Sequence, residues 1–539
     1  MSGHTEVLFR DDARTKLLSG TSALADAVRP TLGPESRSVL LAKRFGTPIV
    51  CDDGVTIAKA FKLEDPEEQL GAEMLRQSAI RTGDTVGDGT TTSMLLAYSI
   101  FAEGLRNIAA GASPIALKRG LQFGLDAAVA AVAELSRPIK SEEDMAHIAT
   151  VSAHNDAQIG ELVARAVSEI GAEGVVSVEE ARGTETELEI VEGMRIDKGY
   201  LSPYFVTDSQ AMEVVLEDPK ILLFDKKITI MSPLLPLLEQ IVQNQHPLVV
   251  VAESVEGEAL ATLVVNRLRG IMAVVAIKAP GFGDRRKEML QDLAVLTGGR
   301  VISEELGDKL ENVTLDDLGG AHRVVVDSDS ATVIDGDGTI EAIDARRDEL
   351  RRKVETTSSD WDREKLEERL ARLSGGVAVI RAGAPSEAEL SRRKEAYDDA
   401  ISSTRAAVAE GVVPGGGTAL LRSIRAVEEE ADRRDGDERT GVLIIRDALS
   451  IPCRQLAANS GVDPGVVVDK VASGSGFFGF DTSEKRYVDL DEVGVIDATK
   501  VVRSALENAV SVAGVLLLTE VTMVEIDDSE PADAMPGMM

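Results

Sequence analysis

The sequence contains very few cysteines. Only Cys51 and Cys453 occur in 539 residues, which is too few for a disulfide framework or a cysteine-based zinc site. The five histidines show no spacing typical of metal ligands. No basic and apolar signal segment opens the chain, so the sequence predicts a cytoplasmic protein.

Aromatic residues and positive charge are also scarce. Aromatic side chains make up 3% of the chain, and 58 Lys and Arg stand against 92 Asp and Glu, for a net charge of −34. Stacking surfaces for bases are therefore not expected, and the acidic field argues against nucleic acid or an anionic membrane as the main partner. No apolar stretch reaches membrane-spanning length free of charge.

Two common nucleotide-binding motifs are not available to this chain. It contains no G-x-x-x-x-G-K-[ST], so a nucleotide site, if there is one, does not use a P-loop. Residues 474–479 satisfy G-x-G-x-x-G, but the FDTSEKRYVDLDEVG that follows does not open an apolar helix. A Rossmann nucleotide site is therefore rejected.

The length and the apolar pattern indicate several domains. A chain of 539 residues exceeds what one hydrophobic core usually serves, which predicts two to four domains. Helical patterns occupy residues 10–28 and 73–135, short β-branched runs alternate with helical segments from about residue 173, and long helices return beyond residue 386. This order predicts an α/β domain inserted into a helical domain whose two halves lie at the chain ends.

Two segments have unusual composition. Residues 340–373 are strongly charged and have the pattern of two helices, which predicts a solvated helical hairpin rather than a binding patch. The tail from residue 528, DSEPADAMPGMM, is polar and contains proline, so we expect it to be disordered.

The most informative stretch is GDGTTT at residues 87–92, just before an apolar run that begins at Met94 with helical spacing. A helix N-terminus offers unpaired N–H donors and a partial positive charge, which together suit a phosphate group. Asp88 would repel a bare phosphate, but a Mg²⁺ ion between the carboxylate and the phosphate oxygens would reconcile the two. The alternative is an ordinary helix with an Asp or Thr N-cap.

Three other turns contain groups that could bind a ligand. The Thr-x-Gly-Pro turn at residues 31–34 could bring backbone donors against a ligand, or could be a simple turn. The acidic turn at residues 52–54 could bind a cation or act as a base, although Asp-Gly is also typical of a hairpin turn. The glycines at 415–417 precede a helical pattern and suit phosphate approach, with a hinge or interhelix turn as the alternative.

Several longer segments resemble one known family, the group I chaperonins or GroEL family. The resemblance runs in collinear order over essentially the whole chain. The matching segments are TLGP, GDGTTT, VVEGMRIDKGYLSPYF, VEGEALATLVVNRLRG, KAPGFGDRRKEMLQDLAVLTGG, RLSGGVAVI and TRAAVAEGVVPGGGTALL.

The resemblance implies a multidomain α and α/β chaperonin fold. A helical equatorial domain that binds ATP would comprise residues 1–134 and 411–539, and a small intermediate hinge domain residues 135–191 and 379–410. An inserted α/β apical domain, residues 192–378, would bind substrate and lid.

The function implied by the resemblance is that of an ATP-dependent molecular chaperone. Hydrolysis of Mg-ATP, with K⁺ as a further ion, would drive the encapsulation of non-native polypeptides beneath a GroES-type co-chaperonin. The chain would assemble with copies of itself into two stacked seven-membered rings. The second hypothesis is a ring-forming paralogue that holds particular proteins and has weak ATPase activity. The third is a soluble phosphotransferase, which would need a small-substrate pocket and an acceptor base that the sequence does not reveal.

The resemblance also implies roles for individual residues. Asp399 would position the attacking water with Asp53 as a second carboxylate, Asp88 would bind Mg²⁺, and Asp497 would bind the ribose. The remaining nucleotide contacts would come from Thr31, Leu32, Gly33, Pro34, Asp52, Gly89, Thr90, Thr91, Thr92, Gly416, Asp481, Thr482 and Ser483. Two positions depart from the family: Asp52 replaces a lysine, and Asp481-Thr482-Ser483 stands where Asn-Ala-Ala is usual.

A last group of residues matches the apolar substrate surface of the family. An exposed apolar rim can bind many unfolded chains because burial of apolar area is non-directional. Apolar residues at these spacings are also typical of an ordinary core, most clearly for the adjacent valines. The residues are Tyr200, Tyr204, Phe205, Leu235, Leu238, Leu260, Val264 and Val265.

Overall fold

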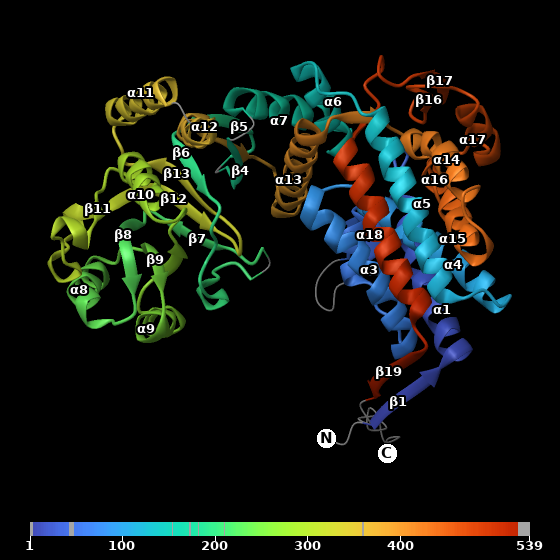
Figure 1. The fold of residues 1–539 in the computed structure, drawn as a ribbon, viewed down its shortest axis with the longest axis horizontal. Helices are drawn as coiled ribbons and strands as arrows, with labels where there is room; N and C mark the ends of the chain where they lie inside the picture. Colours follow the sequence, from blue (N-terminus) through green and yellow to red (C-terminus); the bar gives the residue numbers. More distant parts are fainter. Residues whose placement is uncertain are drawn as a thin grey trace, which may run out of the picture. The chain divides into compact units, whose positions relative to one another are not determined.

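The computed structural model describes residues 4–526 except 43–47, 154, 172–173, 182, 210 and 358–359. The tail from residue 528, expected to be disordered, lies outside the described residues. The chain forms two compact units, Met1–Arg165 with Glu395–Met539, and Ala166–Lys394, which Figure 1 colours in sequence order. The second unit is thus inserted into the first, and the finer division into three domains stays a prediction.

The first unit is mainly helical. Its helices are α1 (Arg10–Val28), α2 (Gly54–Ala60), α3 (Pro66–Val86), α4 (Thr90–Ala109), α5 (Pro114–Leu135), α6 (Glu142–Ser152), α14 (Thr418–Ala431), α15 (Gly436–Ala448), α16 (Ile451–Asn459), α17 (Pro464–Ala472) and α18 (Thr499–Leu518). Two helices, α7 (Ala157–Ile170) and α13 (Glu387–Glu410), continue from this unit into the inserted one.

Short antiparallel strand pairs occur in the first unit. Strands from the two ends of the chain pair with each other (Figure 1), and the strand that leads into the glycine turn at residues 415–417 pairs with a strand near residue 497. The pairs are β1 (His4–Phe9) with β19 (Val521–Ile526), β2 (Val39–Leu41) with β3 (Ile49–Cys51), β15 (Val412–Pro414) with β18 (Ile496–Ala498), and β16 (Phe478–Asp481) with β17 (Arg486–Asp489).

Helices from both chain ends share one hydrophobic core in this unit. Phe101 of α4, Leu117 of α5 and Leu506 of α18 are completely buried in it. Close packing of α5 on α15 depends on glycine, because a Cβ atom on Gly120 would lie only 2.1 Å from the carbonyl oxygen of Glu438. The apolar faces of the N- and C-terminal helices therefore stabilise each other.

Helix α18 is the one described helix that is long and apolar enough to cross a membrane by length and composition alone. Core helices of soluble proteins often have the same length and composition. Here 61% of the apolar window is buried inside the structure, and in Figure 1 α18 (red) runs among α3, α4 and α5. Its hydrophobicity is thus explained by its place in the core.

The inserted unit is an α/β unit built on two sheets. The larger sheet has the order β10-β9-β8-β12-β13-β6, with β11 beside β8 and β7 beside β12, and the smaller has the order β4-β14-β5. The strands are β4 (Val175–Glu180), β5 (Glu187–Val191), β6 (Gly193–Ile196), β7 (Val214–Glu217), β8 (Lys220–Ile228), β9 (Leu248–Val255), β10 (Val274–Lys278), β11 (Val301–Ile302), β12 (Gly319–Val326), β13 (Ala331–Gly336) and β14 (Val377–Ala382). The helices are α8 (Leu235–Asn244), α9 (Gly257–Leu268), α10 (Asp284–Thr297), α11 (Ile340–Thr356) and α12 (Asp360–Gly375).

The predicted alternation of strands and helices in this unit is confirmed. Parallel strands β8, β9 and β10 are the β-branched runs of the sequence, joined by α8 and α9. They are nearly continuous apolar runs because helices cover parallel sheets on both faces. The core of the unit lies between this sheet and its helices.

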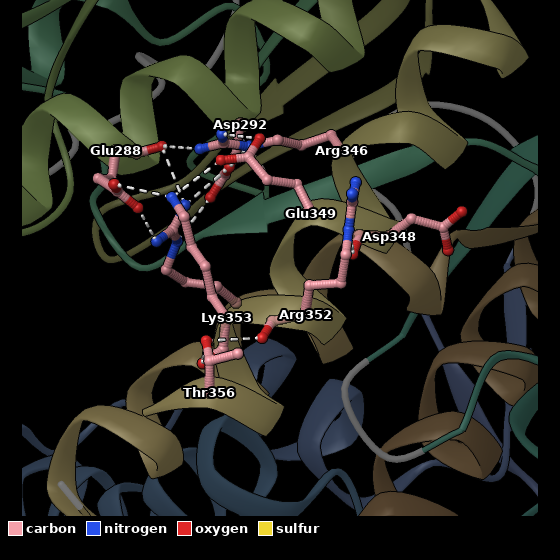
Figure 2. A network of polar contacts seen from close by, with 9 residues as sticks. Glu288, Asp292, Arg346, Asp348, Glu349, Arg352, Lys353 and Thr356 are labelled. Atoms are coloured by element: carbon pink, nitrogen blue, oxygen red, sulfur yellow. Dashed lines mark hydrogen bonds and ion pairs between the residues drawn. The ribbon is translucent and has the colours of Figure 1, made fainter. Parts of the chain in front are cut away.

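The predicted hairpin of charged helices is present as α11 and α12, but it is not solvated on all sides. Figure 2 shows Arg346 of α11 directed at Asp292 of α10, and its Nε donates to Asp292 Oδ1 at 2.8 Å. Arg369 of α12 donates to the same carboxylate, of which 4% is exposed, and also pairs with Glu288. The charge run therefore includes the ion pairs that join the hairpin to α10, because a buried carboxylate requires partners.

Candidate nucleotide-binding site

The GDGTTT segment forms the turn between α3 and α4. Gly87 (φ 72°) ends α3 and Gly89 (φ 76°) is the N-cap of α4, both in the left-handed region that favours glycine. No side chain caps α4; Asp88 Oδ1 instead accepts from the N–H of Gly89 at 2.5 Å. The helix start is confirmed and the alternative of an ordinary side-chain cap is wrong, so no capping side chain takes the N–H groups at the start of α4, and such groups suit an anionic ligand.

The Thr-x-Gly-Pro turn lies against this N-terminus. The hydroxyl oxygens of Thr31 and Thr91, both buried, are 3.4 Å apart. Asn459 of α16 holds the turn in place, because its amide donates to the carbonyl oxygens of Arg29 and Leu32 at 2.9 and 2.8 Å. Across this turn exposure increases from the half-buried Leu32 to the exposed Pro34, with Gly33 (φ 89°) between them.

The acidic turn at residues 52–54 starts a helix. Asp53 is the N-cap of α2 and accepts from the N–H groups of Val55 and Thr56 at 3.3 and 2.6 Å, so the hairpin alternative is wrong. A Cβ atom on Gly54 would lie 2.2 Å from Thr91 Oγ1, which places this turn beside the start of α4. Asp52 is partly exposed one residue before the cap.

Asp399 of α13 approaches the same point from the C-terminal half of the chain. A Cβ atom on Gly87 would lie 2.3 Å from Cβ of Ser402 and 3.5 Å from the carbonyl oxygen of Asp399, so α13 packs directly on the turn. Burial, followed by the charges of Asp88 and Asp53, raises the pKa of Asp399 to about 9. The three carboxylates therefore lie close enough for their charges to interact, and the roles that the resemblance implies for them stay predictions.

Asp497 lies beside the C-terminal glycine turn. Strand β18 pairs with β15 so that Asp497 faces Val413, and the N–H of Gly415 donates to the carbonyl oxygen of Val495 at 3.0 Å. Burial, and then the charge of Asp88, raises the pKa of Asp497 to about 7. The turn joins a strand to α14, whose N-cap Gly417 likewise provides no side-chain cap.

Residues 481–483 begin at the last residue of β16, close to the glycine turn. The carbonyl oxygen of Phe480 would lie 3.5 Å from a Cβ atom on Gly416. Asp481, 5% exposed, accepts from the N–H groups of Ser483 and Glu484 at 3.0 and 3.2 Å. Its carboxylate therefore organises its own turn. The G-x-G-x-x-G sequence before it leads into the β16–β17 hairpin, and the rejection of a Rossmann site is confirmed.

Sequence reasoning missed two acidic residues of α13 and one amide. Glu395 and Asp398 also raise the pKa of Asp399, and Thr56 Oγ1 donates to Glu395 Oε1 at 3.3 Å. Glu395 precedes Asp398 by three residues and Asp399 by four, which places them on one side of a helix. This spacing was a signal that could have identified them. Asn459 had no such signal, because its role depends on a turn 427 residues away in the sequence.

The residues present fit a nucleotide bound with a divalent cation. The helices that follow the two glycine turns, α4 from Thr90 and α14 from Thr418, both begin without a side-chain cap. Burial is the larger cause of the raised pKa values of Asp399 and Asp497, and the charge of Asp88 is the next cause, which a cation bound at Asp88 would relieve. Within the described residues no group of three His, Cys, Asp or Glu side chains could enclose a metal. Asp88 would therefore need phosphate oxygens as further ligands, which is common for Mg²⁺.

The candidate substrate surface of the inserted unit divides into exposed and buried residues. Tyr204, Leu235 and Val265 are 63%, 47% and 43% exposed. Tyr200, Leu260 and Val264 are partly buried against the core of the unit. These six residues are available, at least in part, at the surface.

The expected exposure is wrong for the two remaining residues. Phe205 is completely buried and Leu238 is 6% exposed, and both belong to the hydrophobic core. In the short turn Pro203–Phe205, neighbouring side chains point in different directions, so Phe205 is buried where Tyr204 is exposed. Leu238 lies with Leu237 and Ile241 among the buried residues of α8, whereas Leu235 is the first residue of that helix and remains exposed.

The helical unit with its Gly, Thr and Asp site and the inserted α/β unit together define the multidomain fold of a chaperonin subunit. The family model described as the TCP-1/cpn60 chaperonin family matches residues 24–527. The chain is also 60% identical over 525 residues to Chaperonin GroEL 5 of Bradyrhizobium diazoefficiens, with 97% of each chain covered. The chain belongs to the TCP-1/cpn60 chaperonin family as a group I chaperonin. Membership implies that it binds non-native proteins and forms oligomeric rings.

Proposed function

We propose that the protein is an ATP-driven chaperonin that works in the cytoplasm with Mg²⁺ and K⁺. Its apolar apical surface captures non-native polypeptides, which are enclosed beneath a GroES-type lid. The subunits form two stacked seven-membered rings. The observation that carries the proposal is the meeting of Asp53, Asp88 and Asp399 at the uncapped N-terminus of α4.

Each part of the site has a chemical role in this proposal. The N–H groups at the start of α4 and the hydroxyls of Thr90, Thr91 and Thr92 donate to phosphate oxygens. Asp88 would hold Mg²⁺, which would supply positive charge next to the phosphates. The N–H groups at the start of α14 and Asp497 bind the ribose side next to Gly416.

Asp399 orients the attacking water and accepts its proton. With its pKa at about 9, this carboxyl group retains a proton at neutral pH while the charges of Asp88 and Asp53 are unbalanced. Neutralisation of Asp88 removes one cause of the raised pKa. Burial, the larger cause, remains, so Asp399 serves as the base only once it has lost its own proton.

Measurement of ATP hydrolysis together with refolding of a denatured test protein, with and without a lid protein, tests the proposal. We expect Mg²⁺-dependent hydrolysis and a refolding yield that increases with ATP and lid. Capture of the denatured protein without ATP turnover would contradict the ATP-driven cycle.

That outcome would favour a second candidate function, a specialised holdase with weak ATPase activity. The observation that favours it is Asp52, which adds a negative charge directly before Asp53 at the start of α2. Like charges that are not neutralised by a cation weaken the binding of a triphosphate.

A further inference from the structure

Arg137 binds two carboxylates that are far apart in the sequence. It lies between α5 and α6, and its Nη1 and Nη2 donate to the two oxygens of Asp144 at 2.8 and 3.0 Å. Its Nε donates to Asp491 Oδ1 at 2.9 Å, and Nη2 contacts the same oxygen. The side chains of Arg137 and Asp144 are each 14% exposed and that of Asp491 is 29% exposed. A planar guanidinium group is suited to this double contact.

The backbone of Arg137 is held as well. Its N–H donates to the carbonyl oxygen of Val412 at 2.9 Å, and the N–H of Val412 donates back at 2.8 Å. Val412 begins β15, the strand that leads into the glycine turn at residues 415–417. The adjacent Gly411 (φ 80°) permits this approach, because a Cβ atom there would lie 2.5 Å from the carbonyl oxygen of Arg137.

Asp491 belongs to the turn between β17 and β18, which supports the proposed ribose side. The N–H of Val495 closes the turn by donating to the carbonyl oxygen of Leu490 at 2.9 Å. The carbonyl oxygen of Val495 accepts from Gly415, and Asp497 follows two residues later. The turn therefore connects Asp491, which Arg137 holds, with Asp497 and with the glycine turn that contains Gly416.

Helix α6 packs on the same turn. A Cβ atom on Gly494 would lie 2.5 Å from the imidazole ring of His147. Asp144, in the first turn of α6, is the second carboxylate of Arg137. Lys140 Nζ lies 3.9 Å from Asp491 Oδ2, but its side chain is 65% exposed and cannot replace a shielded guanidinium fork.

We propose that Arg137 is a positioning residue for the nucleotide site. It holds the turn before β18 through its side chain and β15 through its backbone, and so keeps Asp497 and Gly416 in the geometry that binds the ribose. Through Asp144 it links this geometry to α6. The inference rests on the proposed function of ATP binding.

The test compares the affinity for ADP, measured by titration calorimetry in the presence of Mg²⁺, with the ATP hydrolysis rate at saturation. We expect Arg137→Met to weaken ADP binding about 10-fold and Arg137→Lys to weaken it less, since lysine offers a point charge without the fork. The saturated rate should stay within about twofold, because Asp399 is unchanged. Arg425→Met, which removes an 87% exposed arginine paired with Glu429 on α14, is the matched control and should leave both values unchanged.

A double variant separates positioning from simple destabilisation. If Arg137 acts through Asp491, then Arg137→Met, Asp491→Leu and the variant with both changes should all bind ADP with similar, reduced affinity. If the double variant loses the product of the two single losses of ADP affinity, the inference is wrong. It is also wrong if Arg137→Met binds ADP within twofold of the wild type. Either result leaves the proposed function intact. Failure of the wild-type protein to bind ADP would overturn the proposed function and the inference together.

Discussion

Asp399 on α13 lies close enough to Asp88, in the turn before α4, for the two charges to repel each other. After burial, this repulsion is the largest cause that raises the pKa of Asp399 to about 9. The two residues are 311 positions apart in the sequence. Their meeting joins the first and last parts of the chain in one candidate catalytic site.

Replacement of Asp399 tests its assignment as the catalytic base. Asp399→Ala should still bind ATP and should hydrolyse it about 100-fold more slowly, as expected when a positioned base is removed. ATP binding and single-turnover hydrolysis are the measurements, and Asp126→Ala, at an exposed position of α5, is the control. Wild-type turnover in Asp399→Ala would show that another group is the base.

The raised pKa of Asp399 predicts a dependence of stability on pH. Because the pKa rises from 3.8 in the unfolded chain to about 9 in the folded chain, the folded state binds this proton more tightly. The free energy of unfolding should therefore fall as the pH rises between these values, by at most about 1.4 kcal/mol per pH unit for one proton. Denaturant unfolding of the nucleotide-free protein at pH 6 to 9 measures the slope. Asp399→Asn should reduce it, and an unchanged slope would contradict the assignment.

Reversal of the charge at Asp52 distinguishes repulsion from cation binding. Like charges a few ångströms apart repel by about 1 to 4 kcal/mol, depending on the effective dielectric constant. If Asp52 only repels the triphosphate, Asp52→Lys should bind ATP more tightly, and this binding should depend less on the Mg²⁺ concentration. We expect this result because Asp53 and Asp88 already provide the one or two carboxylates that Mg²⁺ usually takes.

ATP titrations at several Mg²⁺ concentrations decide between these alternatives. Asp126→Lys, the same charge change at an exposed position of α5, is the control and should leave the affinity unchanged. Weaker binding by Asp52→Lys at every Mg²⁺ concentration would show instead that Asp52 is a cation ligand.

Substitutions on the apical surface should separate client binding from stability. Val265→Ser and Leu235→Ser remove exposed apolar area, so they should weaken capture of a denatured protein and leave ATP hydrolysis nearly unchanged. Leu238→Ala should instead destabilise the inserted unit by about 2 to 5 kcal/mol, because Leu238 lies in the core. A pull-down of a denatured protein and an unfolding curve measure the two effects. Undiminished capture by both serine variants would contradict the proposed surface.

The ion pairs in Figure 2 predict a large effect from one buried carboxylate. Asp292→Ala leaves Arg346 and Arg369 without their shared partner and should destabilise the inserted unit by about 3 to 5 kcal/mol. Asp348→Ala, which removes an exposed partner of Arg351, should cost less than about 1 kcal/mol. Equal unfolding midpoints for the two variants would show that the network adds no stability.

Local patterns in the sequence were sufficient to predict many elements. The apolar spacing after GDGTTT predicted a helix, and α4 begins at Thr90. The β-branched runs predicted β8, β9 and β10 because parallel strands are buried on both faces. The collinear motifs identified the chaperonin family and, through it, the carboxylates Asp88 and Asp399.

Burial and long-range partners could not be predicted in this way. Phe205 and Leu238 have the same apolar character as Tyr204 and Leu235, and only the packing of the turn and of α8 on the core makes them buried. Asp53 could have closed a hairpin, but its carboxylate caps α2. The inward-pointing arginines of α11 and α12 depend on Asp292, which lies on another helix.

The sequence by itself determined the family, the order of helices and strands and the chemical types at the site, because these depend on residue spacing and collinear motifs. The tertiary structure alone decided which carboxylates share one electrostatic environment and which apolar side chains remain exposed. It also decided that Arg137 joins Asp144 to Asp491. The physical reason is that pKa values, burial and ion pairs depend on distances between atoms from segments hundreds of residues apart, which no local pattern specifies.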